Sequence, residues 1–351
     1  MRRKKWLTLA MAAIAGVVAV TIAAVGGAGK ASARPDATVR VAVVTDIGGL
    51  NDKGFNHLSY VGLQRAKRKL HVQGRVYVTG SAGERQPNLQ SAAQAGYNPV
   101  FAIGVLFEFG PLDAVAPAYK KTKFVGIDVD WKGLSSKPSN VRGIQFKEQE
   151  AGYLVGYIAG LEIKRHPHRG KQVVSGVGAN KVPAIVRFLA GYRAGAKKAD
   201  PRVKVMLDYA NDPTFNDQAK CKETTLNQIN AGSGVVFEAA GGCGLGGLKA
   251  AKQNHIWGIG VDADQSFLGT HILTSATKHV DVAVYDAIKS YKANPSAFKG
   301  GFNKTYNIKN HGVGYGKLSS KLSKADRTYI TTRVNRIARL IAQGKIVPPT
   351  S

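Results

Sequence analysis

The sequence predicts an α/β protein with two doubly wound lobes, each built around a parallel sheet and joined by a hinge of several chain segments. Strand patterns alternate with helical patterns along most of the chain, and 351 residues are enough for two domains with their own cores. The segments 97–128 and 232–262 also look alike: each has a buried strand, a Gly-rich turn, a helix and a second strand that ends in Asp. No Pro/Ser-rich linker divides the chain, so we expect several short crossings between the lobes.

The strand predictions rest on apolar, β-branched runs, of which VRVAVVT at 39–45 is the first. Phe55, Leu58, Ala66 and Leu70 then recur at helical spacing. Further strands are predicted at 75–79, 100–103, 123–127, 172–176, 203–207, 235–239 and 257–261, and the clearest helices at 149–163, 183–198 and 216–231. This alternation predicts parallel sheets with helices on both faces. We expect residues 38–146 and 264–300 to form the first lobe and residues 147–263 and 301–349 the second.

The N-terminal segment has the composition of an export signal. MRRKKW is basic, an uncharged run rich in Ala, Val, Ile and Gly follows, and Ala31-Ser32-Ala33 closes it. We expect residues 1–33 to be a signal peptide and the chain to act outside the cytoplasm, in the periplasm or at the cell surface. A retained membrane anchor is the alternative, because the run is long enough to span a bilayer. We expect no lipid attachment, since no cysteine follows the run.

The chain is strongly basic, with 50 Lys and Arg against 22 Asp and Glu and a formal net charge of +28. Such a charge attracts polyanions. The cations are spread along the chain, without zinc-finger spacing or a recognisable RNA-binding signature, so we do not expect nucleic acid as a partner. Attraction to an anionic cell-envelope surface is the interpretation that remains.

The two cysteines, Cys221 and Cys243, suggest one disulfide in an exported chain. Cys221 lies in a predicted helix and Cys243 follows the next strand, so consecutive elements can bring them together; two free buried thiols are the alternative. His166-Pro-His168, flanked by Lys and Arg, is typical of a solvated loop, and we expect no metal site.

Polar residues and glycines gather directly after the predicted strands, where ligands bind in open parallel sheets. These positions are the DIGGLNDKGFN segment at 46–56, Gly104, Asp128, Gly178, the tract 241–247 and Asp262. Asp52 can cap the next helix. Core packing is the alternative for Phe55, and bonds to local backbone amides the alternative for Asp46. No nucleophile stands with a His and an acid at recognisable spacing, so we expect no catalytic residues and no enzyme.

The tract GGCGLGG has a second interpretation. Gly242, Gly244 and Gly247 match G-x-G-x-x-G after a strand, and Asp262 ends the next strand, as in dinucleotide-binding proteins. An exported protein has little access to nicotinamide cofactors, so we disfavour a dehydrogenase and expect no cofactor. The same glycines let the backbone approach a ligand closely, and Asp262 can accept two hydroxyl hydrogens from a sugar diol.

Several long stretches resemble the basic membrane protein family, the purine-nucleoside receptor type of solute-binding protein for ABC transporters. They are VAVVTDIGGLNDKGFN, KFVGIDVD, FKEQEAGYLVGYIAG, PAIVRFLAGYRAGAK, VVFEAAGGCGLG with WGIGVDADQ, and ILTSATKHVDVAV, and the tail IAQGKIVPP also fits. The resemblance implies a type I periplasmic-binding fold with a three-segment hinge. It also implies a small-molecule ligand, a nucleoside, and an ABC transporter permease as partner.

Residue by residue, the resemblance implies that Phe55 and Phe188 sandwich the base, one from each lobe. It further implies hydrogen bonds to the base or sugar from Asp46, Asn56 and Asp128, close backbone approach at Gly241 and Gly242, and contacts to the ribose hydroxyls from Asp262 and Lys278.

Two departures from the family's sequence pattern leave the identity of the ligand undetermined. Cys243 and Leu245 stand where many relatives have Thr and Asn, and GVLFEFG differs from the usual turn. A disulfide between Cys221 and Cys243 would stiffen the rim of the pocket. Two further functions remain as alternatives: a ligand-sensing subunit of a membrane receptor, and an envelope protein that binds polyanions.

Overall fold

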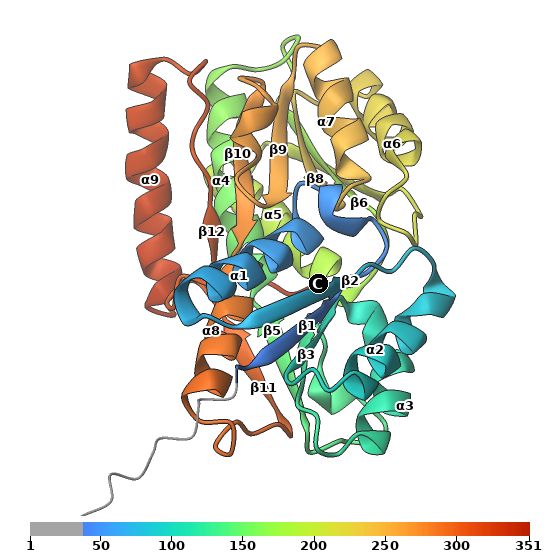
Figure 1. Cartoon of the computed structure of the whole chain (residues 1–351). Coiled ribbons are helices and arrows are strands. Elements are labelled where there is room, and N and C mark those ends of the chain that lie inside the picture. The colour runs from blue at the N-terminus through green and yellow to red at the C-terminus, as the bar shows by residue number, and fades with distance from the viewer. Residues whose placement is uncertain (1–37) are drawn as a thin grey trace, which may run out of the picture. The chain divides into compact units, whose positions relative to one another are not determined.

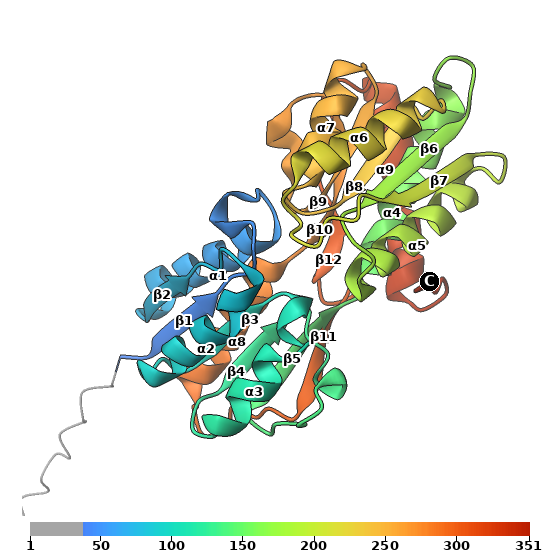
Figure 2. The same ribbon diagram turned by 90° about the vertical axis from the view of Figure 1, so that its right-hand side faces the viewer.

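The structure of the chain, a computed structural model, describes residues 38–351. The predicted signal peptide, residues 1–33, lies outside the described residues. Two six-stranded sheets, each covered by helices, make up the described part (Figures 1 and 2). This confirms the predicted α/β fold with two parallel-sheet lobes. Between residues 38 and 351, every helix is too short or too polar to cross a membrane.

The first sheet has the strand order β11-β5-β4-β3-β1-β2, with all pairs parallel. Its strands are β1 (Arg40–Val44), β2 (Gln73–Tyr77), β3 (Val100–Ile103), β4 (Phe124–Ile127), β5 (Val141–Phe146) and β11 (Phe302–Tyr306). Its helices are α1 (Phe55–Leu70), α2 (Arg85–Gln94), α3 (Pro111–Ala118) and α8 (Val280–Ala293). Alternate residues of β1 belong to different core clusters: Val41 and Val43 join Leu63 of α1, while Ala42 and Val44 join Leu89 of α2. The apolar run of β1 therefore reflects burial on both faces of the sheet.

The second sheet has the order β12-β10-β9-β8-β6-β7. Its strands are β6 (Val173–Gly178), β7 (Lys204–Tyr209), β8 (Val235–Ala239), β9 (Trp257–Asp262), β10 (Ile272–Lys278) and β12 (Val313–Tyr315). Its helices are α4 (Glu148–Arg165), α5 (Pro183–Ala199), α6 (Gln218–Asn230), α7 (Gly244–Gln253) and α9 (Lys324–Ala342). The last strand, β12, pairs antiparallel with β10, whereas the other pairs are parallel.

The two sheets repeat one topology. Apart from β11 and β12, which join late in the chain, each sheet places its first strand between its second and third strands. In this doubly wound order the crossover direction reverses next to the first strand, which is where ligands bind in such folds. The reversal lies between β1 and β3 in one sheet and between β6 and β8 in the other.

The membership of the sheets differs from the lobe boundaries expected from sequence. β10 lies within 264–300, which we assigned to the first lobe, but it is hydrogen bonded to β9 in the second sheet. β11 lies within 301–349, which we assigned to the second lobe, but it pairs with β5 in the first. The chain therefore crosses between the sheets after β5, after β10 and between β11 and β12. The sequence of β10, ILTSATK, shows why it was missed: its polar residues hide a strand in which every residue is buried.

Candidate ligand-binding site

A cavity opens between the carboxyl ends of the two sheets. It encloses about 720 Å³ not occupied by protein atoms, a volume that includes the solvent at its mouth. The segments that follow β1, β3, β4, β7 and β8 line it, together with the ends of β9 and β10 and the first turns of α1 and α5. All nine residues expected at a ligand site lie on this cavity: Asp46, Phe55, Asn56, Asp128, Phe188, Gly241, Gly242, Asp262 and Lys278.

Asp46 follows β1 and is held from behind by Arg85. Its Oδ1 accepts hydrogen bonds from the amide of Ile47 at 2.7 Å and from Nε of Arg85 at 2.8 Å. Burial raises the pKa of the Asp46 carboxyl, and the Arg85 guanidinium offsets part of that effect. The other oxygen, Oδ2, faces Gly104, another lining residue, where a Cβ would come within 3.0 Å of it. Oδ2 is therefore the acceptor that Asp46 can offer to a ligand.

Asn56 supports Asp46 from α1. Its Oδ1 accepts from the backbone amide of Asp46 at 3.1 Å, and its Nδ2 donates to the carbonyl of Ile47 at 3.4 Å. Asp52 caps the same helix by accepting from the amides of Gly54, Asn56 and His57. Asn56 thus holds the turn after β1 in place, and one hydrogen of its Nδ2 remains for a ligand.

A buried chain of charges links the cavity to the hinge. Nζ of Lys278 lies 2.5 Å from Oδ2 of Asp128 and 3.0 Å from Oε1 of Glu148, and Arg187 donates to Glu148 at 2.6 Å. Although burial acts to lower it, the pKa of Lys278 is raised by Asp128 and Glu148. Asp128 belongs to the first lobe, whereas Glu148, Arg187 and Lys278 belong to the second. Because the charges alternate in sign, each compensates its neighbour in a site where an unpaired charge would be costly.

Asp128 and Asp262 occupy equivalent places in the two lobes. Asp128 directly follows β4 and Asp262 is the last residue of β9, and both lie in the left-handed region, with φ of 63° and 62°, an uncommon conformation for a residue other than glycine. Two residues on, Asp130 and Asp264 each cap a short 3-10 helix. Oδ1 of Asp128 is buried and has no hydrogen-bond partner among residues 38–351. Burial raises the pKa of Asp262 to about 7, and Lys278 offsets only part of that effect.

The two aromatic residues of the expected sandwich both line the cavity but differ in exposure. Phe55 is half-buried on the cavity, but Phe188 is only 1% exposed and its ring packs edge to face on Phe237. The half-buried Phe215, in the loop after β7, also lines the cavity and was not among the expected residues. Lys278 lies close to Phe55 and Phe146, with its Nζ 5.1 Å and 4.9 Å from the two ring centroids.

The second lobe closes the cavity with the Gly-rich tract. Gly241 has a φ of 57° and lies against Phe215, whose carbonyl oxygen would be 3.3 Å from a Cβ at that position. Cys243, within this tract, is joined to Cys221 in a disulfide, as the sequence suggested. His166 and His168 do not take part in any cluster of three or more potential metal ligands within the described chain.

Sequence reasoning missed Phe215, Arg85 and Glu148 for different reasons. Phe215 follows β7, an edge strand away from the reversal of the sheet, so its position after a strand carried no signal. Arg85 begins a helix far from any strand end, and Glu148 lies within the segment FKEQEAGYLVGYIAG that we quoted for the resemblance without giving Glu148 a role. All three act through contacts between segments distant in the sequence.

The lining residues are suited to a neutral ligand rich in hydrogen-bond donors. Four carboxyls line the cavity, those of Asp46, Asp52, Asp128 and Asp262. Lys278 is the one Lys or Arg among the lining residues. Ionised carboxylates only accept hydrogen bonds, so the ligand must supply N–H or O–H groups. Two lobes that enclose such a cavity and are joined by three chain crossings define a two-lobed solute-binding protein.

Comparison with known proteins gives the family. The model of the Bmp family, described as ABC transporter substrate-binding protein PnrA-like, matches residues 39–344. The chain belongs to this family. Substrate-binding proteins of ABC transporters act outside the cytoplasm on small molecules that they pass to transporter partners.

Individual relatives agree with this assignment. The chain is 31% identical to the ABC transporter nucleoside-binding protein BmpA of Lactococcus lactis, over 99% of both chains. It is 33% identical to an uncharacterized lipoprotein of Pyrococcus abyssi, over 87% of this chain and 76% of that one. Among solved structures, a solute-binding protein of an ABC transporter system from Aeropyrum pernix K1 superimposes with a TM-score of 0.76 at 26% identity, covering 89% and 94% of the two chains.

Proposed function

We propose that this protein binds a nucleoside between its two lobes, without catalysing a reaction, and delivers it to an ABC transporter. The observation that carries the proposal is the pair of strand-end carboxylates, Asp128 and Asp262, beside the half-buried Phe55. The buried, unpartnered Oδ1 of Asp128 calls for a donor from the ligand. A nucleoside supplies both a flat ring and a set of hydroxyl donors, and the relative in Lactococcus lactis is named for nucleoside binding.

In this proposal the base lies against Phe55, with Oδ2 of Asp46 as acceptor for an N–H on the base edge. Asp262 accepts two hydroxyl hydrogens of the ribose, since one carboxylate can accept from both. Asp128 accepts a further hydrogen, and the backbone at Gly241 and Gly242 closes the second side. Phe188 supports the wall from within the second lobe, because its ring is almost fully buried.

Titration calorimetry of the purified, ligand-stripped protein tests the proposal. The panel is adenosine, guanosine, inosine, cytidine and uridine, with D-ribose as a sugar without a base. We expect at least one nucleoside to bind, and Asp262→Asn to weaken its binding about 100-fold or more, because two charge-assisted hydrogen bonds are lost. Asp208→Asn, at an exposed aspartate of the same lobe, is the matched control and should bind as the wild type does. Binding of D-ribose alone, or no binding across the panel, would remove nucleosides from the function.

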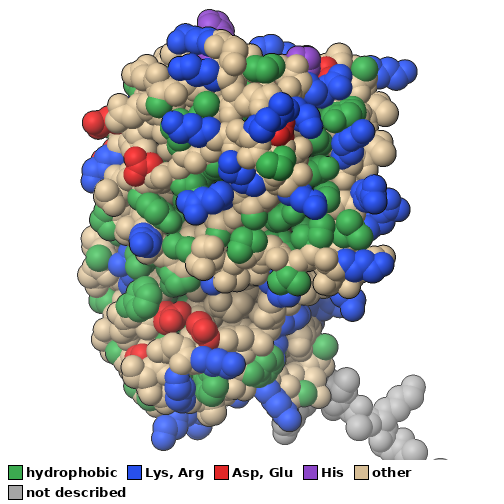
Figure 3. All heavy atoms as spheres, turned by 180° about the vertical axis from the view of Figure 1, so that it is seen from behind, with side chains coloured by type: hydrophobic (Ala, Val, Ile, Leu, Met, Phe, Trp, Pro, Cys, Tyr) green, Lys and Arg blue, Asp and Glu red, His purple; other side chains and the backbone are tan. Residues whose placement is uncertain are grey.

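We also propose that the basic surface keeps the protein near anionic polymers or lipids of the cell envelope. Lys and Arg are scattered over the face seen in Figure 3, where they outnumber the acidic side chains. Binding to vesicles that contain anionic lipid should be clear at low salt and should weaken as salt is raised, since exposed charges are screened. Binding that does not depend on salt would contradict this proposal. The cleavage of residues 1–33 and the absence of lipid attachment stay predictions.

A further inference from the structure

The loop after β7 brings Phe215 to the cavity in a strained backbone conformation. Phe215 has a φ of 57°, in the left-handed region that bulky residues rarely adopt, and its ring is half-buried on the cavity. Such a conformation persists only where the surroundings hold it, and it is found preferentially at functional sites. The contacts of the loop therefore show what holds Phe215 in this conformation.

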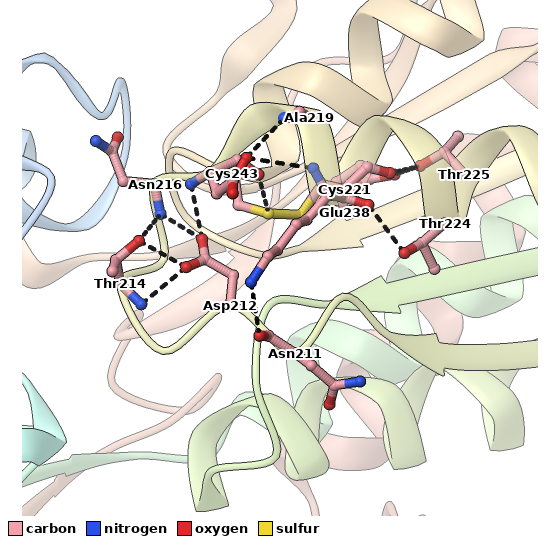
Figure 4. The surroundings of a disulfide bond; sticks show 12 residues. Asn211, Asp212, Thr214, Asn216, Ala219, Cys221, Thr224, Thr225, Glu238 and Cys243 are labelled. Atoms are coloured by element: carbon pink, nitrogen blue, oxygen red, sulfur yellow. Dashed lines mark hydrogen bonds between the residues drawn. A yellow bond between two sulfur atoms is a disulfide. The ribbon is translucent and has the colours of Figure 1, made fainter.

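Asp212 holds the loop from within. Its carboxylate accepts hydrogen bonds from the amides of Thr214 at 2.9 Å, Asn216 at 2.7 Å and Asp217 at 2.7 Å, and from the Thr214 hydroxyl at 2.6 Å. Figure 4 shows the bonds of Asp212 to Thr214 and Asn216, the two residues that flank Phe215 in the sequence. Asp217 in turn caps α6 by accepting from the amide of Ala219 at 3.0 Å. The loop is thus anchored to the start of α6.

The disulfide ties the same loop to the Gly-rich tract. Cys221 lies in the first turn of α6, and its bond to Cys243 brings the two Cα atoms within 5.5 Å. The amide of Cys243 donates to the carbonyl of Phe215 at 3.0 Å, so the crosslinked residue itself holds the strained peptide. Both cysteines are fully buried. The side chain of Asn216 points away from the disulfide (Figure 4), and its Oδ1 would lie 2.8 Å from a Cβ at Gly242 and 3.9 Å from one at Gly48 of the first lobe.

We propose that the Cys221–Cys243 disulfide and Asp212 are positioning elements for ligand binding, and that they hold Phe215 as an aromatic wall of the cavity on the second lobe. The proposal rests on the proposed function and deepens it. It assigns the wall opposite Phe55 to Phe215, while the almost fully buried Phe188 supports that wall from within the second lobe. Removing the crosslink then lowers affinity as well as stability.

A double-mutant cycle on the dissociation constant separates positioning from stability. The two changes are Phe215→Ala and the combined Cys221→Ser/Cys243→Ser, measured with the tightest nucleoside of the panel well below the melting temperature of every variant. We expect each change alone to weaken binding about tenfold, and the combination to be no weaker than Phe215→Ala alone, since coupled sites are not additive. The loss of thermal stability from the missing crosslink should appear in both backgrounds.

Val334→Ala in α9 is the matched control for lost stability. Val334 is fully buried in the second lobe and far in sequence from the loop, so its truncation should lower the melting temperature and leave affinity unchanged. Additive losses in the cycle, or an equal loss of affinity in the control, would overturn the proposal.

Hydrogen exchange tests the positioning without any ligand. The amides of Thr214, Asn216, Asp217 and Cys243 should exchange at least about tenfold faster once the crosslink is removed, while those of β6 keep their protection. Unchanged exchange in the loop would overturn the proposal even if nucleosides bind. If no nucleoside binds to the wild-type protein, the proposed function fails, and exchange alone decides whether the disulfide positions this loop.

Discussion

Asp262 is the residue whose protonation should set the pH dependence of ligand binding. Burial raises its pKa to about 7 in the unliganded cavity, and a carboxylate that accepts two hydroxyl hydrogens must be ionised. Below pH 7 binding has to release a proton first, so the affinity for a nucleoside should fall about tenfold for each pH unit. Above pH 7 it should be constant.

Calorimetry of the bound nucleoside between pH 5 and 9 checks this prediction. Asp262→Asn should bind more weakly at every pH and lose the slope near pH 7, because its amide does not titrate. An unchanged slope in that variant would assign the titration to another group, such as Asp128. Burial raises the pKa of Asp128 above its ordinary value, and Lys278 offsets only part of that effect.

Glu238 is a second buried acid, and it affects stability. It lies on β8 behind the disulfide, and burial raises its pKa from its ordinary 4.5 to about 8. The hydroxyl of Thr225 lies 2.6 Å from Oε1 of Glu238 and 2.7 Å from the carbonyl of Cys221. The single hydrogen of the Thr225 hydroxyl is shared between these two acceptors, and Oε2 of Glu238 has no hydrogen-bond partner among residues 38–351, so burial favours the protonated, neutral form of Glu238.

This protonation predicts a loss of stability as pH rises. The unfolded chain releases the proton of Glu238 above pH 4.5, whereas the folded chain keeps it until about pH 8, so the free energy of unfolding should decrease between these values and then level off. Glu238→Gln should remove this contribution, on the order of 5 kcal/mol across the range. Urea unfolding of both proteins from pH 4 to 9 measures it. Parallel curves would show that Glu238 is ionised in the folded protein.

At the scale of elements, α4 and α5 pack backbone against backbone. Gly152, Gly156 and Gly160 follow one face of α4 at a spacing of four residues, and Gly191 and Gly195 follow α5. A Cβ on Gly156 would lie 2.1 Å from the carbonyl oxygen of Tyr192, and one on Gly195 would lie 2.0 Å from that of Tyr153. These distances leave no room for a methyl group. The glycines therefore determine how closely α5, which carries Phe188 to the cavity wall, approaches α4.

Gly156→Ala should consequently destabilise the protein, although glycine to alanine inside a helix normally stabilises it by about 1 kcal/mol. Overpacking should lower the free energy of unfolding by about 2–3 kcal/mol, measured by urea denaturation. Gly83→Ala is the matched control, because a Cβ at Gly83 meets no atom within 4 Å and the change should be close to neutral. Equal stability of the two variants would show that α5 can shift away from α4 at little cost.

At the scale of the whole molecule, the cavity and the surface carry opposite charge. The chain has a formal net charge of +28, and basic side chains spread over the surface (Figure 3), yet the lining residues of the cavity include four aspartates and one lysine. The exterior thus attracts anions while the cavity repels them. A phosphorylated ligand is therefore attracted to the exterior of the protein but repelled inside the cavity.

We therefore expect the 5′-monophosphate of the bound nucleoside to bind at least about 100-fold more weakly than the nucleoside, through repulsion in a site of low dielectric constant. Competition calorimetry at about 50 and about 300 mM salt measures this difference. The two salt concentrations change the Debye length roughly twofold, so attraction to the exposed surface weakens while repulsion inside the cavity is screened much less. The neutral 5′-O-methyl nucleoside is the control for size. Equal affinity of nucleoside and monophosphate at the higher salt would contradict the assigned charge of the cavity.

Much of this architecture could be predicted before folding is considered. The apolar runs of β1, β3, β4, β8 and β9 mark buried parallel strands. The residues at their carboxyl ends, such as Asp46 in the first lobe and Asp262 in the second, gather at one edge of their own sheet because parallel strands end at the same edge. The position of Asp52 follows from local helix-capping chemistry, whereas the role of Phe55 is implied by the family resemblance. The sequence by itself thus determined the fold class and the polar residues of the cavity.

Only the tertiary structure decided the lobe boundaries, the aromatic wall and the charge partners. β10 and β11 carry polar residues, so their sheets are set by pairing between distant segments rather than by a local pattern. Phe215, Arg85 and Glu148 acquire their positions through contacts with Cys243, Asp46 and Lys278, which lie at least 28 residues away in the chain. Local sequence fixes what a residue can do chemically, whereas long-range packing fixes which neighbours it meets.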